Sequence, residues 1–131
     1  MAITHVQRMR VQWVDTDGSG LIHYTAALRY FEVAEHALVR QLFEGSSAPP
    51  FMLPRVHVEA DYRAPLRYPD EFDCTARIAA VGTSSVTYAY EIRRIDGPLC
   101  IVGKIVAAAI DMDGSKIPLP DDARALFTSA L

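Results

Sequence analysis

The stretch T-A-A-L-R-Y-F-E-V-A-E-H-A-L-V-R-Q-L-F, residues 25–43, decides the fold, because it is the longest helical pattern in the chain. Its large apolar residues recur at steps that fit one face of a helix, and its alanines favour helix formation. Thr25 precedes the pattern, so its hydroxyl is expected to cap the helix by accepting a free amide of the first turn. The large apolar residues of the predicted buried face are Leu28, Phe31, Leu38 and Leu42.

Alternating apolar residues predict five strands around this helix. Before the helix, Met9, Val11 and Trp13 alternate with polar residues, the period-two pattern of a strand with one buried face. Turn formers separate the strands after the helix, so consecutive strands are expected to be antiparallel neighbours. The last strand is apolar at nearly every position, which predicts a central strand covered on both faces. These later strands are predicted over residues 56–62, 72–80, 86–92 and 101–110.

The order of these elements predicts an α+β fold in which a five-stranded antiparallel sheet wraps around one long helix. The 131 residues fit a single domain over residues 1–131, with a loop at 45–50 and a short surface helix within 118–131. One helix covers only one face of the sheet. The uncovered strands therefore predict a homodimer or a homotetramer.

Composition and charge exclude several classes of protein. Half of the residues are apolar and 22% are charged, as in an ordinary soluble globular domain. The net charge of −3 argues against a nucleic-acid binder. No signal-like segment or run of about 18 apolar residues is found, which predicts a cytoplasmic protein without a membrane span. Cys74 and Cys100 lie in apolar strands without zinc spacing, so they are expected to be core thiols and no metal is expected.

Three interpretations compete for the stretch V-D-T-D-G-S-G-L-I-H-Y, residues 14–24, between the first strand and the helix. Asp and Gly are common in turns, so a purely structural turn is one interpretation. D-T-D-G-S-G also resembles the start of an EF-hand calcium loop, but its twelfth position is Ala26 rather than Glu. The stretch D-M-D-G-S-K at 111–116 departs from a calcium loop as well, because Lys116 occupies the glycine position and a hairpin-like turn explains it.

The third interpretation of residues 14–24 is catalytic. A carboxylate in a glycine-containing loop before a helix lies beside free backbone N–H groups with partial positive charge. Such amides can hold the carbonyl oxygen of a thioester and stabilise the oxyanion that develops during acyl transfer. In that arrangement Asp17 is placed to attack the carbonyl carbon. Composition alone does not choose among the three interpretations.

The segment W-V-D-T-D-G-S-G-L-I-H-Y, followed by L-R-Y-F-E-V-A-E-H-A-L-V-R, resembles the signature of the 4-hydroxybenzoyl-CoA thioesterase-like family of hot-dog enzymes, which includes Tol–Pal-linked thioesterases. The similarity continues through V-E-A-D-Y-R-A-P-L-R-Y-P-D-E-F, V-G-T-S-S-V and I-D-M-D-G-S-K-I-P-L-P, so it covers nearly the whole chain. It implies a hot-dog fold and an acyl-CoA thioesterase without a cofactor, coenzyme A being part of the substrate.

The resemblance also implies roles for individual residues. Asp17 matches the catalytic carboxylate, as nucleophile or general base, whereas Asp15 is expected to be a structural turn residue. Gly20 matches the family's glycine, and the amide that polarises the carbonyl falls at Tyr24. Many relatives have a histidine in this turn, which corresponds to His23 or to the Tyr24 position. Because some Tol–Pal-linked relatives have their catalytic histidine where this chain has Tyr24, the role of His23 stays open.

Coenzyme A carries phosphates, so basic and hydroxyl side chains are expected at its binding site. The candidates for these contacts are Arg63, Arg67, Arg93, Arg94, Ser84 and Ser85. Two other functions remain compatible with the sequence: a non-hydrolytic protein that binds acyl-CoA or acyl-carrier protein, and a hot-dog enoyl-CoA hydratase. Within the helix, Glu35 or Glu32 is expected either to pair with a neighbour such as Arg29 or His36, or to position a water molecule or order a ligand.

Overall fold

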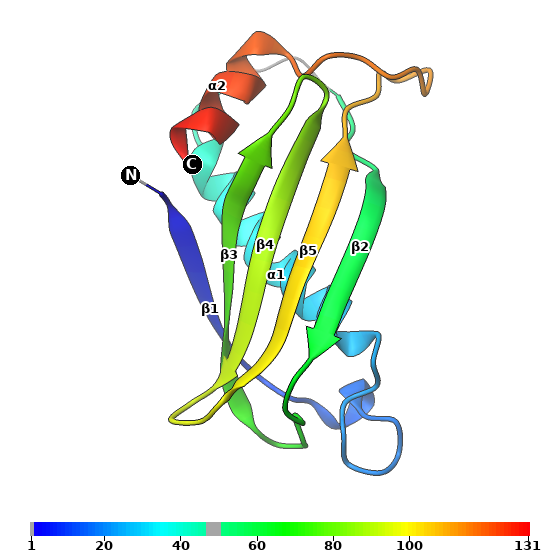
Figure 1. Ribbon diagram of the computed structural model, residues 1–131, viewed down its shortest axis with the longest axis vertical. Helices are drawn as coiled ribbons and strands as arrows, with labels where there is room; N and C mark the ends of the chain where they lie inside the picture. The colour runs from blue at the N-terminus through cyan, green and yellow to red at the C-terminus, as the bar shows by residue number, and fades with distance from the viewer. Residues whose placement is uncertain (1, 47–50) are drawn as a thin grey trace.

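The computed structural model describes residues 2–46 and 51–131, which form a five-stranded antiparallel sheet packed against one long helix (Figure 1). The predicted α+β architecture is therefore confirmed, and residues 47–50 of the predicted loop lie outside the described residues. The elements are β1 (Thr4–Arg10), α1 (Ala26–Leu42), β2 (Arg55–Tyr62), β3 (Glu71–Val81), β4 (Ser85–Arg94), β5 (Leu99–Ala108) and α2 (Asp121–Ser129).

The strand order is β1-β3-β4-β5-β2, so the prediction that all consecutive strands are neighbours is only partly right. The pairs β3–β4 and β4–β5 are antiparallel neighbours as expected. β2 instead pairs with β5 at one edge, while β1 pairs with β3 at the other edge (Figure 1). The segment 63–70 contains two prolines and crosses the end of the sheet between β2 and β3, where a hairpin was expected.

β5 lies next to the edge strand β2, and the central strand is β4. On the face of β5 that points away from α1, Val102 and Val106 are only half-buried. The prediction of a central strand covered on both faces is therefore wrong for this chain. Val102 and Val106, on the outer face of β5, are therefore only partly covered by the described chain.

α1 packs on the sheet through four buried residues, Tyr30, Phe31, Ala34 and Leu38. Leu28 was predicted on this buried face, but it is 37% exposed, so that part of the prediction is wrong. The ring of Phe31 stacks on Tyr90 of β4, with 4.5 Å between the ring centroids, and it also lies against Gly103 of β5. A Cβ added at Gly103 would lie 2.3 Å from Phe31 Cε2. The absence of a side chain at position 103 thus lets the helix approach the sheet.

The first strand ends earlier than its alternating pattern predicts. β1 stops at Arg10, and residues Trp13–Asp15 form a 3-10 turn. Trp13 is 59% exposed and packs edge-to-face on Tyr68, with 5.4 Å between the ring centroids. The prediction that Trp13 belongs to the buried face of a strand is wrong, because the chain has already left the sheet at this point.

Glu35 is buried in the core, and its partner differs from the expected one. Its carboxylate accepts hydrogen bonds from Arg55 Nη2 and from the Tyr90 hydroxyl, both at 2.5 Å. Arg55 begins β2, so the predicted pairing with Arg29 or His36 is wrong, although an arginine is the partner. Both oxygens of Glu35 are occupied, and Glu32 lies exposed on the helix. The arrangement favours a structural ion pair over a water-positioning group.

The chain closes with α2, which confirms the predicted short helix near the C-terminus. Pro120 occupies its N-cap position, and Phe127 is buried against Phe43 with 5.1 Å between the ring centroids. α2 therefore covers one end of the core, above the turn between β3 and β4 (Figure 1). Across residues 2–46 and 51–131, neither helix has the length and apolar character needed to cross a membrane.

Candidate active site

The loop between β1 and α1 is a tight turn that depends on two glycines. Gly18 and Gly20 have φ angles of 96° and 95°, a region that residues with a Cβ rarely adopt. The base of the turn is closed by a bridge between Thr16 and Ile22 and by the Asp17 N–H, which donates to the Leu21 carbonyl at 3.0 Å. Gly20 therefore has a conformational reason to be glycine, and the turn fixes the backbone of Asp17.

A second segment fastens this loop to the end of the sheet. The Ile22 N–H donates to the Leu66 carbonyl at 3.0 Å, and Leu21 forms a bridge with Arg67. Residues 21 and 22 thus pair with the crossing segment between β2 and β3. This pairing carries Leu21 and Ile22 towards the apolar interior, while the tip of the loop stays at the surface.

Asp15 has a structural environment, as the sequence predicts. Its side chain is 3% exposed. Oδ2 accepts hydrogen bonds from the Gln12 N–H and the Tyr30 hydroxyl, at 2.9 and 2.8 Å, and Oδ1 accepts one from Arg29. Burial alone would raise the pKa of Asp15, but these donors and the Arg29 charge hold it below its ordinary value. Both carboxylate oxygens of Asp15 are therefore occupied by donors of the chain itself.

Asp17 has the opposite environment two residues further along the loop. It is exposed, and its Oδ1 accepts hydrogen bonds from the Ser19 hydroxyl at 2.5 Å and the Ser19 N–H at 2.9 Å. The Ser19 donors hold the pKa of Asp17 below its ordinary value, with a smaller contribution from His23. Among the described residues, no group donates a hydrogen bond to Oδ2. Asp17 is thus an ionised carboxylate with one oriented and one available oxygen.

The backbone at the start of α1 offers one unused donor. The His23 N–H donates to the Asp15 carbonyl at 2.7 Å, and the Thr25 N–H donates to His23 Nδ1 at 3.2 Å. Between them, the Tyr24 N–H makes no hydrogen bond with any residue in 2–46 or 51–131. It precedes a helix of 17 residues, whose first turn carries partial positive charge. This N–H is suited to bind a carbonyl oxygen.

The prediction that the Thr25 hydroxyl caps the helix is wrong. Its hydroxyl contacts His23 Nδ1 at 2.8 Å and accepts no amide of the first turn. The imidazole of His23 instead accepts the Thr25 N–H, which makes Nδ1 the acceptor nitrogen and leaves Nε2 as the nitrogen available to solvent. The ring of His23 stacks on Tyr24 with 4.6 Å between the centroids. His23 therefore has a clear structural contact with the helix start, and its catalytic role stays a prediction.

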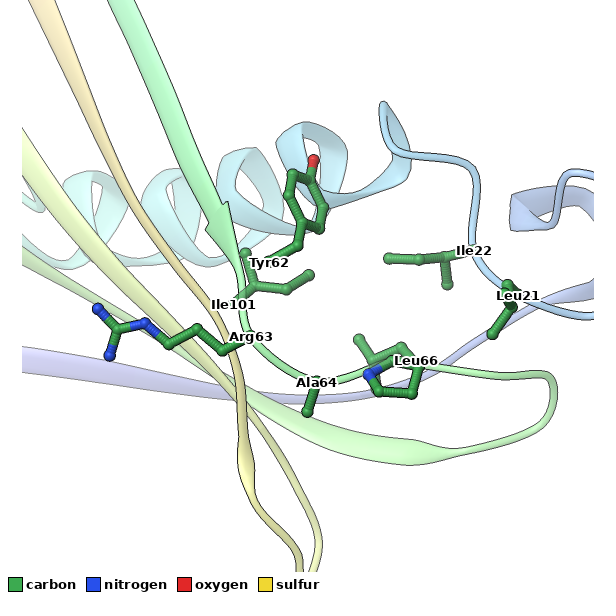
Figure 2. A pocket seen from close by; sticks show the side chains of 8 residues that line it. Leu21, Ile22, Tyr62, Arg63, Ala64, Leu66 and Ile101 are labelled. Atoms are coloured by element: carbon green, nitrogen blue, oxygen red, sulfur yellow. The ribbon is translucent and has the colours of Figure 1, made fainter.

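A cavity of about 260 Å³ lies beside the loop, where the ends of β2 and β5 meet the crossing segment (Figure 2). Its lining is mostly apolar, and Figure 2 shows the Arg63 side chain directed away from Leu21 and Leu66. Asp17 is not part of the lining. No sequence pattern signals this cavity, because its walls come from three segments far apart along the chain. They are Leu21, Ile22, Tyr62, Arg63, Ala64, Pro65, Leu66 and Ile101.

The residues predicted to contact coenzyme A lie at two ends of the sheet. Arg63 and Arg67 are exposed on the crossing segment, near the loop that carries Asp17. Ser84 and Ser85 lie at the turn between β3 and β4, at the opposite end and next to α2 (Figure 1). The 11 residues of β3 separate the two ends by roughly 30 Å. A single chain therefore does not bring these serines to Asp17, and their binding role stays a prediction.

The calcium interpretation finds no support in the donor groups. No cluster of three or more His, Cys, Asp or Glu side chains suited to a metal occurs in the described part of the chain. Ala26, the twelfth position of the EF-hand-like stretch, is the buried first residue of α1. In the second stretch, Asp111 Oδ1 accepts the N–H groups of Asp113 and Ser115, at 3.0 and 2.9 Å. That stretch is a hairpin-like turn, as predicted.

Comparisons with known proteins agree with this architecture. The family model of the Thioesterase superfamily matches residues 19–101, more than half of the chain, and begins two residues after Asp17. The "Putative esterase" of Aquifex aeolicus (strain VF5) is 30% identical over 94 residues, which cover 70% of this chain and 73% of that protein.

Two solved structures illustrate the shared fold. A 1,4-dihydroxy-2-naphthoyl-CoA thioesterase from Synechocystis has a TM-score of 0.82 and 21% identity, with 96% of each chain covered. The protein SAV2348 from Staphylococcus aureus, solved in complex with CoA, has a TM-score of 0.85 and 12% identity, with 99% of this chain and 85% of that chain covered. The predicted hot-dog fold is confirmed.

Proposed function

Since the chain belongs to the Thioesterase superfamily, we propose that it hydrolyses an acyl-CoA thioester to a carboxylic acid and free coenzyme A. One observation carries the proposal. The available oxygen of Asp17 and the unused N–H of Tyr24 belong to the same short connection between β1 and α1. A carboxylate and an oxyanion donor on one rigid turn are the two groups that thioester hydrolysis requires.

In the proposed reaction the Tyr24 N–H binds the thioester carbonyl oxygen and stabilises its developing negative charge. As a nucleophile, Asp17 attacks the carbonyl carbon, the C–S bond breaks, CoA leaves as the thiolate, and water then hydrolyses the mixed anhydride. As a general base, Asp17 takes a proton from the water that attacks the same carbon, and the C–S bond then breaks to release CoA and the carboxylic acid. Both routes require the ionised form of Asp17, and its lowered pKa supports that form at neutral pH.

The substrate is proposed to span the cavity and the exposed arginines. The apolar lining of the cavity suits the acyl group, which buries best against aliphatic side chains. Arg63 lines the cavity with its side chain directed away from Leu21 and Leu66, and Arg67 is exposed on the same crossing segment. Their guanidinium groups can bind the phosphates of coenzyme A. No metal or separate cofactor takes part in the proposed reaction.

We propose further that the active protein is a homodimer or a homotetramer. Asp17 is exposed in one chain, so a closed site requires a second surface over it. The edge strand β2 leaves Val56 and Val58 exposed by 62% and 44%, an apolar edge that a second copy would cover. A partner chain would also supply its turn with Ser84 and Ser85, which lies at the far end of its sheet from its own Asp17.

Release of free thiol from acyl-CoA tests the proposal directly. The protein is incubated with a panel graded by acyl-chain length and aromaticity, and thiol is detected with a chromogenic disulfide reagent. Because Cys74 and Cys100 are buried, the folded protein adds little background to this assay. A thioesterase releases CoA thiol from at least one member of the panel. A non-hydrolytic binding protein releases none, and an enoyl-CoA hydratase forms a hydrated acyl-CoA without free thiol.

A further inference from the structure

Tyr62 joins the end of β2 to the start of α1. Its hydroxyl donates a hydrogen bond to the backbone carbonyl of Tyr24, 38 residues earlier in the sequence. The same side chain lines the apolar cavity (Figure 2). In the described residues, no backbone N–H donates to this carbonyl, which lies one residue before the N-cap residue Thr25. The phenol of Tyr62 is thus the group that holds the Tyr24 carbonyl.

The contacts on both sides of Tyr24 have a common geometric effect. On its N-terminal side, the His23 carbonyl, which shares a peptide group with the Tyr24 N–H, accepts a hydrogen bond from the Ala26 N–H at 2.9 Å. On its C-terminal side, the carbonyl is bound to Tyr62 and the following N–H to His23 Nδ1. The peptide groups that flank Tyr24 are therefore both anchored, and its own N–H is the one group left without a partner. Rotation of the backbone at this residue would break at least one of these hydrogen bonds.

From this arrangement we propose that Tyr62 is a positioning residue, which holds the Tyr24 N–H in the orientation that stabilises the oxyanion. The inference rests on the proposed thioesterase function. A preorganised donor stabilises developing charge without reorientation during the reaction, so loss of its anchor raises the barrier of the chemical step. Partial burial raises the pKa of Tyr62, and the neighbouring Tyr24 raises it further. The phenol therefore stays protonated, and a donor, at neutral pH.

A merely structural role for Tyr62 would have different consequences. If its hydroxyl only fastened β2, its removal would lower stability, while the folded enzyme kept its turnover number. If Tyr62 only shaped the cavity, its replacement by Phe would change little, because the aromatic ring remains. Tyr62→Phe removes the hydroxyl alone, so it separates positioning from both alternatives.

The test compares Tyr62→Phe with Tyr68→Phe, a matched loss of one phenol hydroxyl. Tyr68 is 47% exposed and packs on Trp13, and its hydroxyl makes no hydrogen bond with the described residues. With the best acyl-CoA of the panel, we expect Tyr62→Phe to lower kcat roughly 10-fold and to change KM by less than about twofold. Tyr68→Phe should retain the parent kcat. A parental kcat in folded Tyr62→Phe would overturn the proposal.

A second measurement tests the positioning itself, independently of hydrolysis. In ¹⁵N-labelled protein, we expect the order parameter of the Tyr24 amide to fall in Tyr62→Phe and to keep its parental value in Tyr68→Phe. An unchanged order parameter in Tyr62→Phe overturns the proposal, whatever the kinetics show. If the parent protein releases no thiol from any acyl-CoA, the proposed function fails. A fall of the order parameter would then support the anchoring role of Tyr62 without the catalytic one.

Discussion

The hydroxyl of Tyr30, on α1, donates a hydrogen bond of 2.8 Å to the buried carboxylate of Asp15, in the connection that also carries Asp17. Together with Gln12 and Arg29, Tyr30 lowers the pKa of Asp15 although burial alone would raise it. Folded Asp15 therefore releases its proton at lower pH than unfolded Asp15 does. Its contribution to stability is complete above a pH of about 4 and is lost as the pH falls through the lower pKa of the folded state.

Replacement of Asp15 by Asn should accordingly lower stability and alter its acid dependence. At pH 7 we expect the free energy of unfolding to fall by about 1 to 3 kcal/mol, because buried hydrogen bonds to a charged group are lost. Below a pH of about 4 the difference between the two proteins should shrink. Urea denaturation at several pH values measures both effects. A difference that stays constant from pH 7 to pH 3 would contradict this role of Asp15.

Gly103 lies close against Phe31 of α1, so Gly103→Ala should destabilise the protein. The added Cβ would lie 2.3 Å from Phe31 Cε2, and the ring must move off its position on Tyr90. We expect a loss of about 1 to 3 kcal/mol in the free energy of unfolding.

The double variant Gly103→Ala with Phe31→Leu provides the control. Because the smaller side chain removes the overlap, its loss of stability should be less than the sum of the two single losses. Additive losses would show that the contact between positions 31 and 103 does not limit the packing.

The periodic elements of this fold are readable from the sequence, whereas contacts between distant segments are not. The helix and the strands follow from apolar spacing, which reflects local geometry. The edge position of β2 depends on how the segment 63–70 crosses the end of the sheet, and no residue pattern encodes that path. The end of β1 was missed because Trp13 continues the alternation after the chain has turned away.

The same distinction applies to the candidate site. Through the family resemblance, Asp17 was predicted to be the catalytic carboxylate and Asp15 a structural turn residue. Asp15 is buried and hydrogen-bonded to Tyr30, and the catalytic role of Asp17 stays a prediction. The contact between Tyr62 and Tyr24 joins residues that are 38 positions apart, so local spacing carries no signal for it. Glu35 was expected to need a partner, but Arg55 lies 20 residues away on β2, so the sequence did not identify it as that partner.

The oligomer is tested by sedimentation. We expect the smallest active species to have at least twice the mass of 14.5 kDa for one chain, since one helix leaves strands uncovered. A Val56→Lys and Val58→Lys double variant, which places charge on the exposed side chains of β2, should dissociate the assembly and lose activity together. A 14.5 kDa species with full activity would contradict the shared site.

Chelation tests the proposed independence from metals. The described residues hold no cluster of metal-binding side chains, and the EF-hand-like loop has Ala26 where a bidentate Glu is needed. We therefore expect dialysis against EDTA to leave thiol release unchanged. Loss of activity in EDTA, with recovery on addition of calcium, would restore the calcium interpretation of residues 14–24.

The most direct test of the account is the rate of thiol release by Asp17→Asn, measured on folded protein beside Asp15→Asn. Asn keeps the size of the side chain and removes the charge that a nucleophile or a general base requires. We expect kcat of Asp17→Asn to fall roughly 10²-fold or more, with KM little changed, and folded Asp15→Asn to lose much less. Hydrolysis at the parent rate by folded Asp17→Asn would contradict the assignment of Asp17 as the catalytic carboxylate.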